Sequence, residues 1–274
     1  MRLLLASPLL FLSAACAAAS CEHRADRSFE VDRSGVQSLA VRLGSTDLEL
    51  RGVPGLQRIE VRATACASSA DALERLQVSQ RRDGDRVEVT AERSGTTSIT
   101  LFGSTYAYID LEIRVPGDLR VEVDTGSGDV DARNLDAFSY KAGSGDLELR
   151  DVSGNVVVEV GSGDVEAENV GTFVLTATGS GDIEVDRVKG AVQVGRVGSG
   201  DVTFTKVGGS VDIERVGSGD VVLRDVEGNV RIGSIGSGDV TVNGVRGDLT
   251  VQSKGSGDIS HRDVGGRIDV PAKR

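Results

Sequence analysis

The stretch GSGDVTFTKVGGSVDIERV, residues 198–216, decides the fold, because its first four residues occur eight times in the chain. Successive copies begin 17, 18, 18, 19, 19, 19 and 19 residues apart. A catalytic site is normally built once, whereas a unit that recurs at a nearly constant period is typical of a structure that stacks. The copies begin at Gly126, Gly143, Gly161, Gly179, Gly198, Gly217, Gly236 and Gly255.

Apolar residues alternate with polar ones in two short runs within each unit. In the quoted unit they are Val202, Phe204, Val207, Val211, Ile213 and Val216. The units that start at Asp182 and Asp220 place apolar residues at the same offsets. Alternation with a period of two puts every second side chain on one face of a strand. Each unit therefore predicts two short strands that face inward, with turns between them.

Two strands of this length cannot enclose a core alone, but stacked coils can. Each strand then pairs in parallel with its equivalent one coil along, at about 4.8 Å, and the inward residues form continuous ladders. The chain has 36 glycines, 4 prolines and only 3% aromatic residues, which favours short strands, tight turns and an aliphatic core. We predict an all-β fold, a parallel β-solenoid of 17–19-residue coils. The general preference for right-handed parallel connections favours that hand.

The Gly-Ser-Gly-Asp turns stack their carboxylates into an acidic column. Glycine supplies backbone angles that other residues avoid, and the Ser and Asp side chains accept hydrogen bonds from nearby amides. Bound Ca²⁺ is the alternative, but calcium-binding β-rolls have two glycine-rich turns per coil, and this unit has one GSGD. We therefore expect no metal and no cofactor. The turn aspartates are Asp129, Asp146, Asp164, Asp182, Asp201, Asp220, Asp239 and Asp258.

The residues before the regular repeats read as a β-rich cap. Residues 44–53 are a degenerate copy of the unit, residues 81–86 (RRDGDR) fit a hairpin turn, and residues 96–104 alternate like a strand. Asp110 lies nineteen residues before Asp129, so we expect the solenoid to begin near Tyr108. The predicted organisation is a cap at 20–107, a solenoid at 108–270 and a tail at 271–274. In that tail Pro271, Lys273 and Arg274 discourage further strand pairing.

The N-terminus has the pattern of a secretory signal peptide, residues 1–19: one basic residue, an apolar run and small residues before the cleavage point. Cleavage leaves two cysteines, Cys21 and Cys66. In an oxidising compartment, two such thiols favour a disulfide. Lipidation of Cys16 or Cys21 is the competing interpretation, with an outer-membrane lipoprotein as its consequence. We expect a soluble exported protein of the periplasm or cell surface, without a transmembrane segment after cleavage.

Charge and motif content exclude several functions. The mature chain has 30 basic and 42 acidic residues, a net charge of −12 that repels nucleic acid. No nucleotide-binding or nucleophile-elbow motif is present, and the only histidines are His23 and His261. We expect His261 to cover the end of the core and His23 to be solvated. The sequence therefore predicts a protein that is not an enzyme.

Serial GSGDV, GSGDI and GSGDL units after an alternating N-terminal region resemble the bacterial DUF4097 family of β-strand-repeat proteins, described as “putative adhesins”. The resemblance covers residues 28–270 and implies a noncatalytic cell-envelope protein whose repetitive acidic surface binds a protein or a glycan. One alternative is a periplasmic stress or signalling accessory that contacts its partner through the cap. Another is a carbohydrate-active β-helix enzyme, which is disfavoured because the carboxylates recur along the rod instead of converging in one cleft.

Overall fold

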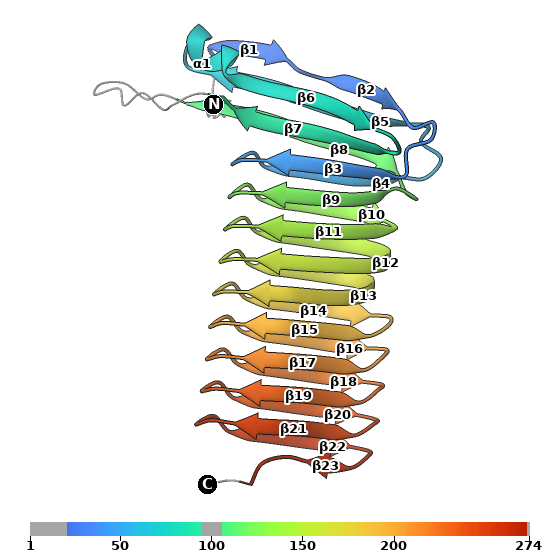
Figure 1. The fold of residues 1–274 in the computed structure, drawn as a ribbon, viewed down its shortest axis with the longest axis vertical. Helices are drawn as coiled ribbons and strands as arrows, with labels where there is room; N and C mark the ends of the chain where they lie inside the picture. The colour runs from blue at the N-terminus through green and yellow to red at the C-terminus, as the bar shows by residue number, and fades with distance from the viewer. Residues whose placement is uncertain (1–20, 95–105, 273–274) are drawn as a thin grey trace, which may run out of the picture.

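The computed structural model describes residues 21–94 and 106–272 as a rod of stacked coils with a cap at one end (Figure 1). The predicted parallel β-solenoid is thus confirmed. The signal peptide predicted at 1–19, the strand predicted at 96–104, and Lys273 and Arg274 lie outside the described residues. Within the described residues, no helix has the length and apolar character needed to cross a membrane.

Each coil of the rod contributes one strand segment to each of two faces. Two strands, β12 (Leu147–Val160) and β13 (Val165–Thr178), run without interruption through both faces. The other strands of the first face are β4 (Leu48–Val53), β8 (Ala107–Pro116), β10 (Val130–Leu135), β14 (Ile183–Val188), β16 (Val202–Val207), β18 (Val221–Val226), β20 (Val240–Val245) and β22 (Ile259–Val264). Those of the second face are β3 (Ser38–Leu43), β7 (Arg86–Arg93), β9 (Arg120–Thr125), β11 (Ala137–Ala142), β15 (Val192–Val197), β17 (Val211–Val216), β19 (Val230–Ile235), β21 (Leu249–Lys254) and β23 (Ile268–Asp269).

Equivalent residues of successive coils lie side by side. Val202 pairs with Val221, and Phe204 with Leu223, between β16 and β18. The alternating apolar residues point inward and are buried, whereas their neighbours face solvent. Because the register repeats from coil to coil, the interior consists of continuous ladders of like residues.

The aromatic residues of the Gly-Ser-Gly-Asp repeats are inside the core. Phe138, Tyr140, Phe173 and Phe204 are among the largest fully buried side chains. The hydroxyl of Tyr140 donates a hydrogen bond to the carbonyl oxygen of Gly145 at 2.9 Å. Burial, with a smaller contribution from nearby aspartates, raises the pKa of Tyr140, so its hydroxyl stays protonated and continues to donate.

Each coil with a Gly-Ser-Gly-Asp turn has a left-handed residue five positions after its turn aspartate. The positive φ values there range from 54° to 74°. This residue inserts one extra outward position, which explains the three-residue step that follows the alternation in each first-face strand. The residues are Asn134, Asp151, Asn169, Arg187, Lys206, Asp225, Gly244 and Asp263.

The glycines of the Gly-Ser-Gly-Asp turns are required by stacking, not by their own backbone angles. None of them has a positive φ, so the expectation that they supply unusual angles was wrong. A Cβ on Gly200 would lie 2.0 Å from the carbonyl oxygen of Gly181, in the turn one coil before. Real Cβ atoms do not approach other atoms so closely, so only glycine lets successive turns come into contact.

Most of the cap is formed by the segment between β4 and β9, which leaves the rod after β4 and returns to it at β9. The degenerate copy at residues 44–53 is part of a true coil, because β3 and β4 pair in parallel with β9 and β10. On their other side the same two strands pair in parallel with β7 and β8. The boundary predicted between residues 107 and 108 therefore does not separate cap from rod in space: a coil from the N-terminal part lies between β8 and β10.

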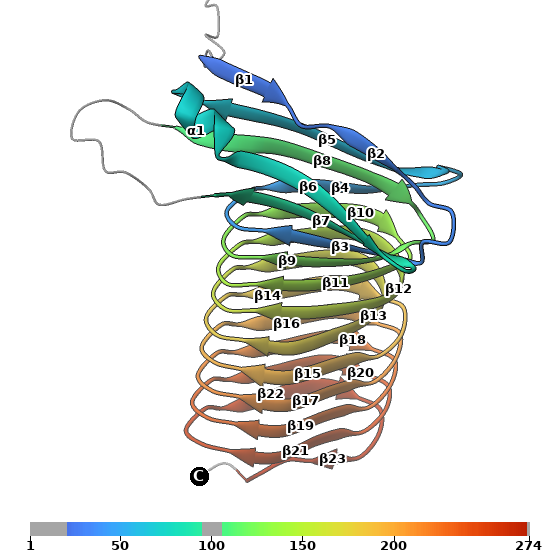
Figure 2. The same ribbon diagram turned by 45° about the horizontal axis from the view of Figure 1, so that its top comes forward.

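Antiparallel strands cover the end of the rod beyond β7 and β8 (Figure 2). Here β5 (Arg58–Ala67) pairs with β8, and β6 (Leu76–Asp83) pairs with β7 through the predicted hairpin turn. The other edge of β5 carries β1 (His23–Asp26) and β2 (Phe29–Asp32). A short helix, α1 (Ala70–Glu74), connects β5 to β6. These strands close the hydrophobic core at this end.

Ion pairs attach the cap to the rod. Arg42 of β3 contacts Glu88 of β7 at 2.9 Å and Asp124 of β9 at 3.2 Å. The hydrogen bond from Arg42 lowers the pKa of the Glu88 carboxyl. Arg33 and Asp118 make a second pair at 2.8 Å, which lowers the pKa of Asp118. The Arg42 pairs bridge β3 to the strands on either side of it, whereas the Arg33 pair joins two connecting segments. The exposure of these pairs to solvent limits what each contributes to stability.

We predict that Val211→Asp unfolds several coils. Val211 is 1% exposed, so the substitution buries a charge among aliphatic residues. The free energy of unfolding should fall by more than about 4 kcal/mol, measured by chemical denaturation. Gln193→Asp, an exposed position one coil before, adds the same charge and should change stability by less than about 0.5 kcal/mol. Equal effects of the two variants would contradict a core of inward ladders.

We predict that Gly200→Ala destabilises the rod through the clash with the previous turn. The expected loss is about 2 kcal/mol or more, measured by thermal and chemical unfolding. Gly44→Ala is the control, since it makes the same change at the first glycine of the degenerate turn, where a Cβ would meet nothing within 4 Å. If Gly44→Ala were as damaging as Gly200→Ala, close stacking of the turns would not be the reason for these glycines.

Candidate functional site

The turn aspartates form one hydrogen-bonded ladder along an edge of the rod. In each coil the backbone N–H of the aspartate donates to the Oδ1 of the aspartate one coil nearer the cap, at 2.7–3.0 Å. The series begins at Asp47, which accepts from Asp129, and ends with Asp258, which donates to Asp239. The structure therefore places all eight predicted turn aspartates in a single column.

The ladder identifies the partner of each carboxylate. The sequence predicted donors within the same turn, whereas the donor in the structure is the amide of the aspartate in the next coil. An amide donor stabilises a carboxylate, which offsets the repulsion between like charges one strand spacing apart. Among residues 21–94 and 106–272, no group of three or more His, Cys, Asp or Glu side chains is arranged to hold a metal ion. The column acts structurally, by joining coils.

A second, shorter ladder lies at the opposite corner of the rod. The amide of Asn229 donates to Ser210 Oγ at 3.1 Å, and that of Asp248 donates to Asn229 Oδ1 at 2.9 Å. The amide of Arg267 continues the series to Asp248 Oδ1 at 2.7 Å. Sequence analysis missed this ladder, because Ser, Asn and Asp occupy the position in turn without a common motif.

Cys21 and Cys66 are joined by a disulfide, with their Cα atoms 5.7 Å apart. Cys66 is on β5, and β1 pairs with β5 directly after Cys21. The bond closes a loop with a sequence separation of 45 residues. In the chain-entropy model this contributes about 4 kcal/mol by restricting the unfolded chain. The disulfide thus fixes the outermost strand of the cap.

The two histidines lie at opposite ends of the molecule and cannot act together. His23 is on β1 and exposed, as expected. His261 pairs with the inward residue Val242, which is the predicted register, and it is exposed although Val242 is buried. The reason is that no described coil follows β22.

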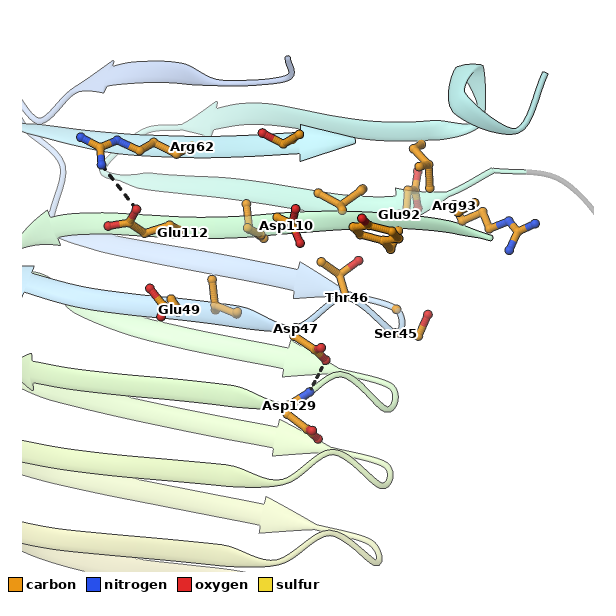
Figure 3. A pocket seen from close by; sticks show the side chains of 18 of the residues that line it. Ser45, Thr46, Asp47, Glu49, Arg62, Glu92, Arg93, Asp110, Glu112 and Asp129 are labelled. Atoms are coloured by element: carbon orange, nitrogen blue, oxygen red, sulfur yellow. Dashed lines mark hydrogen bonds and ion pairs between the residues drawn. The ribbon is translucent and has the colours of Figure 1, made fainter. Parts of the chain in front are cut away.

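A groove with a volume of about 1010 Å³ lies at the junction of cap and rod (Figure 3). It lies beside the end of the aspartate column that faces the cap. Six strands contribute residues: β4 and β10 from the side of the repeats, and β5, β6, β7 and β8 from the side of the cap. The seven acidic residues that line it are Asp47, Glu49, Glu92, Asp110, Glu112, Asp129 and Asp131.

Only two basic residues, Arg62 and Arg93, line the same groove. Arg62 contacts Glu112 at 3.4 Å, and this arginine is therefore already engaged. Asp110 and Asp131 have no ion-pair partner among the described residues. Tyr108 also lines the groove and is 44% exposed. The groove thus combines an excess of negative charge with an accessible aromatic ring.

We predict that the aspartate ladder depends on an acceptor oxygen and not on negative charge. Asp201 Oδ1 accepts from the amide of Asp220 at 2.8 Å. Asp201→Asn keeps an acceptor and should cost less than about 1 kcal/mol, whereas Asp201→Ala should cost about 1–2 kcal/mol, both measured by chemical denaturation. A loss for Asp201→Asn as large as that for Val211→Asp would show that the charge itself is needed.

Comparison with known proteins identifies the family and adds little on chemistry. Curated proteins gave no match. Among solved structures, a “putative cell adhesion protein” from Clostridium sporogenes is 11% identical, covering 91% of this chain and 100% of that chain, with a TM-score of 0.37. A “putative lipid binding protein” from Parabacteroides distasonis is 15% identical, with 92% and 98% covered and a TM-score of 0.37. A “putative adhesin” from Bacteroides fragilis is 11% identical, with 91% and 98% covered and a TM-score of 0.35.

The family match rests on the coils themselves. The family described as “Toastrack DUF4097” matches residues 36–227, which is well over half of the chain. The match begins just before β3, so it includes the first coil, the cap strands from β5 onward and most of the repeats. The chain therefore belongs to the Toastrack DUF4097 family.

Proposed function

We propose that this protein is a noncatalytic binding protein of the cell envelope, and that its acidic groove holds a lysine- or arginine-rich segment of a partner protein. The observation that carries the proposal is the groove itself, where Asp110 and Asp131 lack ion-pair partners beside the exposed ring of Tyr108. Carboxylates attract ammonium and guanidinium groups, and a tyrosine face adds cation–π attraction. Both features favour a basic ligand.

The fold supports a binding role in preference to catalysis. Binding grooves require a rigid frame, and here the frame is a hydrogen-bonded rod with a disulfide-anchored cap. The disulfide fits the oxidising environment of exported proteins. Carboxylates do gather in the groove, but no histidine or cysteine is among the residues that line it. The sequence suggested binding either through the repetitive acidic surface of the rod or through the cap. The groove combines these two hypotheses, since it is built from cap and rod together.

A protein partner fits the surface better than a glycan. Sugar sites rely on exposed aromatic rings that stack on the pyranose face. Tyr108 is the only large aromatic exposed among the described residues. A single ring gives little stacking surface for a polysaccharide, whereas one ring among carboxylates suits a lysine or arginine side chain.

We predict that a fluorescent twelve-residue Lys/Arg-rich peptide binds in the groove, as measured by fluorescence anisotropy at low ionic strength. Asp110→Asn combined with Asp131→Asn should weaken binding about tenfold, since each lost pair is worth up to about 1 kcal/mol. The control combines Asp212→Asn with Glu214→Gln on β17, which removes the same charge from exposed positions on a distant coil and should change affinity less than about twofold. Equal weakening by the two double variants would show that only overall charge attracts the peptide, which would contradict the groove as the binding site.

A further inference from the structure

Among residues 21–94 and 106–272, nothing covers the end of the rod away from the cap. The last two strands, β22 and β23, pair only with β20 and β21, their equivalents one coil before. No described strand lies beyond them, in contrast to the other end, where β5 and β6 cover the rod (Figure 1). A sheet edge of this kind exposes a row of backbone groups that can pair with another chain.

Two amides at this edge lack the partner that their equivalents have. In the preceding coil the amide of Val240 donates to Asp258 O and that of Leu249 donates to Arg267 O, both at 2.8 Å. The equivalent amides of the last coil belong to Ile259 and Ile268. Among the described residues, no following coil offers them an acceptor. Both faces of the rod therefore end in donors that point away from it.

The hydrophobic ladders also end uncovered here. Ile268 continues the ladder of Leu249, which is fully buried, yet Ile268 is 42% exposed. Ile259, which continues the ladder of Val240, is only half-buried. Ile268 and Tyr108 are the two exposed large hydrophobic residues of the described chain. The open edge thus has both backbone N–H groups without an acceptor among the described residues and core side chains that are exposed to solvent.

The charge distribution near this edge favours a second copy of this chain as its partner. The chain as a whole has a net charge of −11, which opposes contact between copies along the rod. Residues 258–274 differ, with three acidic and four basic residues, so this end does not repel itself. Arg267 and Asp269 flank Ile268 on either side. If β23 meets a second β23 antiparallel about Ile268, each Arg267 faces Asp269 of the second copy.

We propose that two copies of this chain associate end to end through β22 and β23. A two-fold axis perpendicular to the rod makes β22 antiparallel to β22 of the second copy and, at the same time, β23 antiparallel to its counterpart, so both faces continue across the interface. Each Ile268 packs on its counterpart at the axis. Pro271 has no N–H to donate and confines pairing to the residues before it. The assembly closes at two copies, because the other end of each rod is capped.

We predict that the exported chain, with its disulfide intact, shifts from one to two copies as its concentration rises, measured by size-exclusion chromatography with light scattering. Ile268→Lys brings like charges together at the axis and should weaken association at least tenfold. Val222→Lys, which adds the same charge at an outward position on the side of the rod, should leave association unchanged. Thermal melts establish that both variants are folded.

Hydrogen exchange gives a second measurement that does not depend on a substitution. The amides of Ile259 and Ile268 should exchange more slowly at high than at low protein concentration, while those of β16 should not change. A single copy at every concentration, equal association of Ile268→Lys and wild type, or assemblies that grow beyond two copies would each overturn the proposal. None of these outcomes depends on peptide binding in the groove.

Discussion

Contact between the backbones of successive Gly-Ser-Gly-Asp turns is the interaction on which the rest of the structure depends. The serine amide donates to the first glycine carbonyl of the preceding turn, as in the 2.8 Å bond from Ser199 to Gly179. The second glycine lies so close to its predecessor that a Cβ on Gly219 would be 1.9 Å from an oxygen. The aspartate amide then reaches the previous carboxylate. Both faces can keep strand spacing only because this corner is so compact.

The constancy of this corner explains where the repeat tolerates variation. Four residues separate the strands there in every coil, from residues 126–129 to residues 255–258. The change from a 17-residue to a 19-residue period occurs at the opposite corner, where one residue, Asp136, connects β10 to β11 and three connect β14 to β15. In the coils with the longer corner, this corner carries the second ladder, whose acceptor is Ser, Asn or Asp. One corner therefore fixes the stacking, and the other absorbs differences in length.

The two ends of the rod, as the described residues form it, differ in how the core and the sheets are covered. At one end the chain covers the ladders with antiparallel strands and a disulfide, and the junction leaves an acidic groove. At the other end the ladders and the strand edges stay open. The middle of the rod offers a regular, ion-paired surface, exemplified by Arg187, which contacts both Glu168 and Asp186. The distinctive surfaces of the molecule are therefore at its ends.

The sequence by itself determined the strands, their inward residues, the period and the parallel stacking, because these follow from local alternation and from repetition. It also indicated the Cys21 and Cys66 pair and the aspartate column. Only the tertiary structure decided why the turns need glycine and which residue is left-handed, since Arg187 and Lys206 take that conformation without being turn formers. Only the tertiary structure shows that the coil of β3 and β4 pairs with β7 and β8, an arrangement that forms the groove. The reason is distance along the chain: the bond from Asp129 to Asp47 joins residues 82 apart, and local sequence patterns carry no information on contacts of that range.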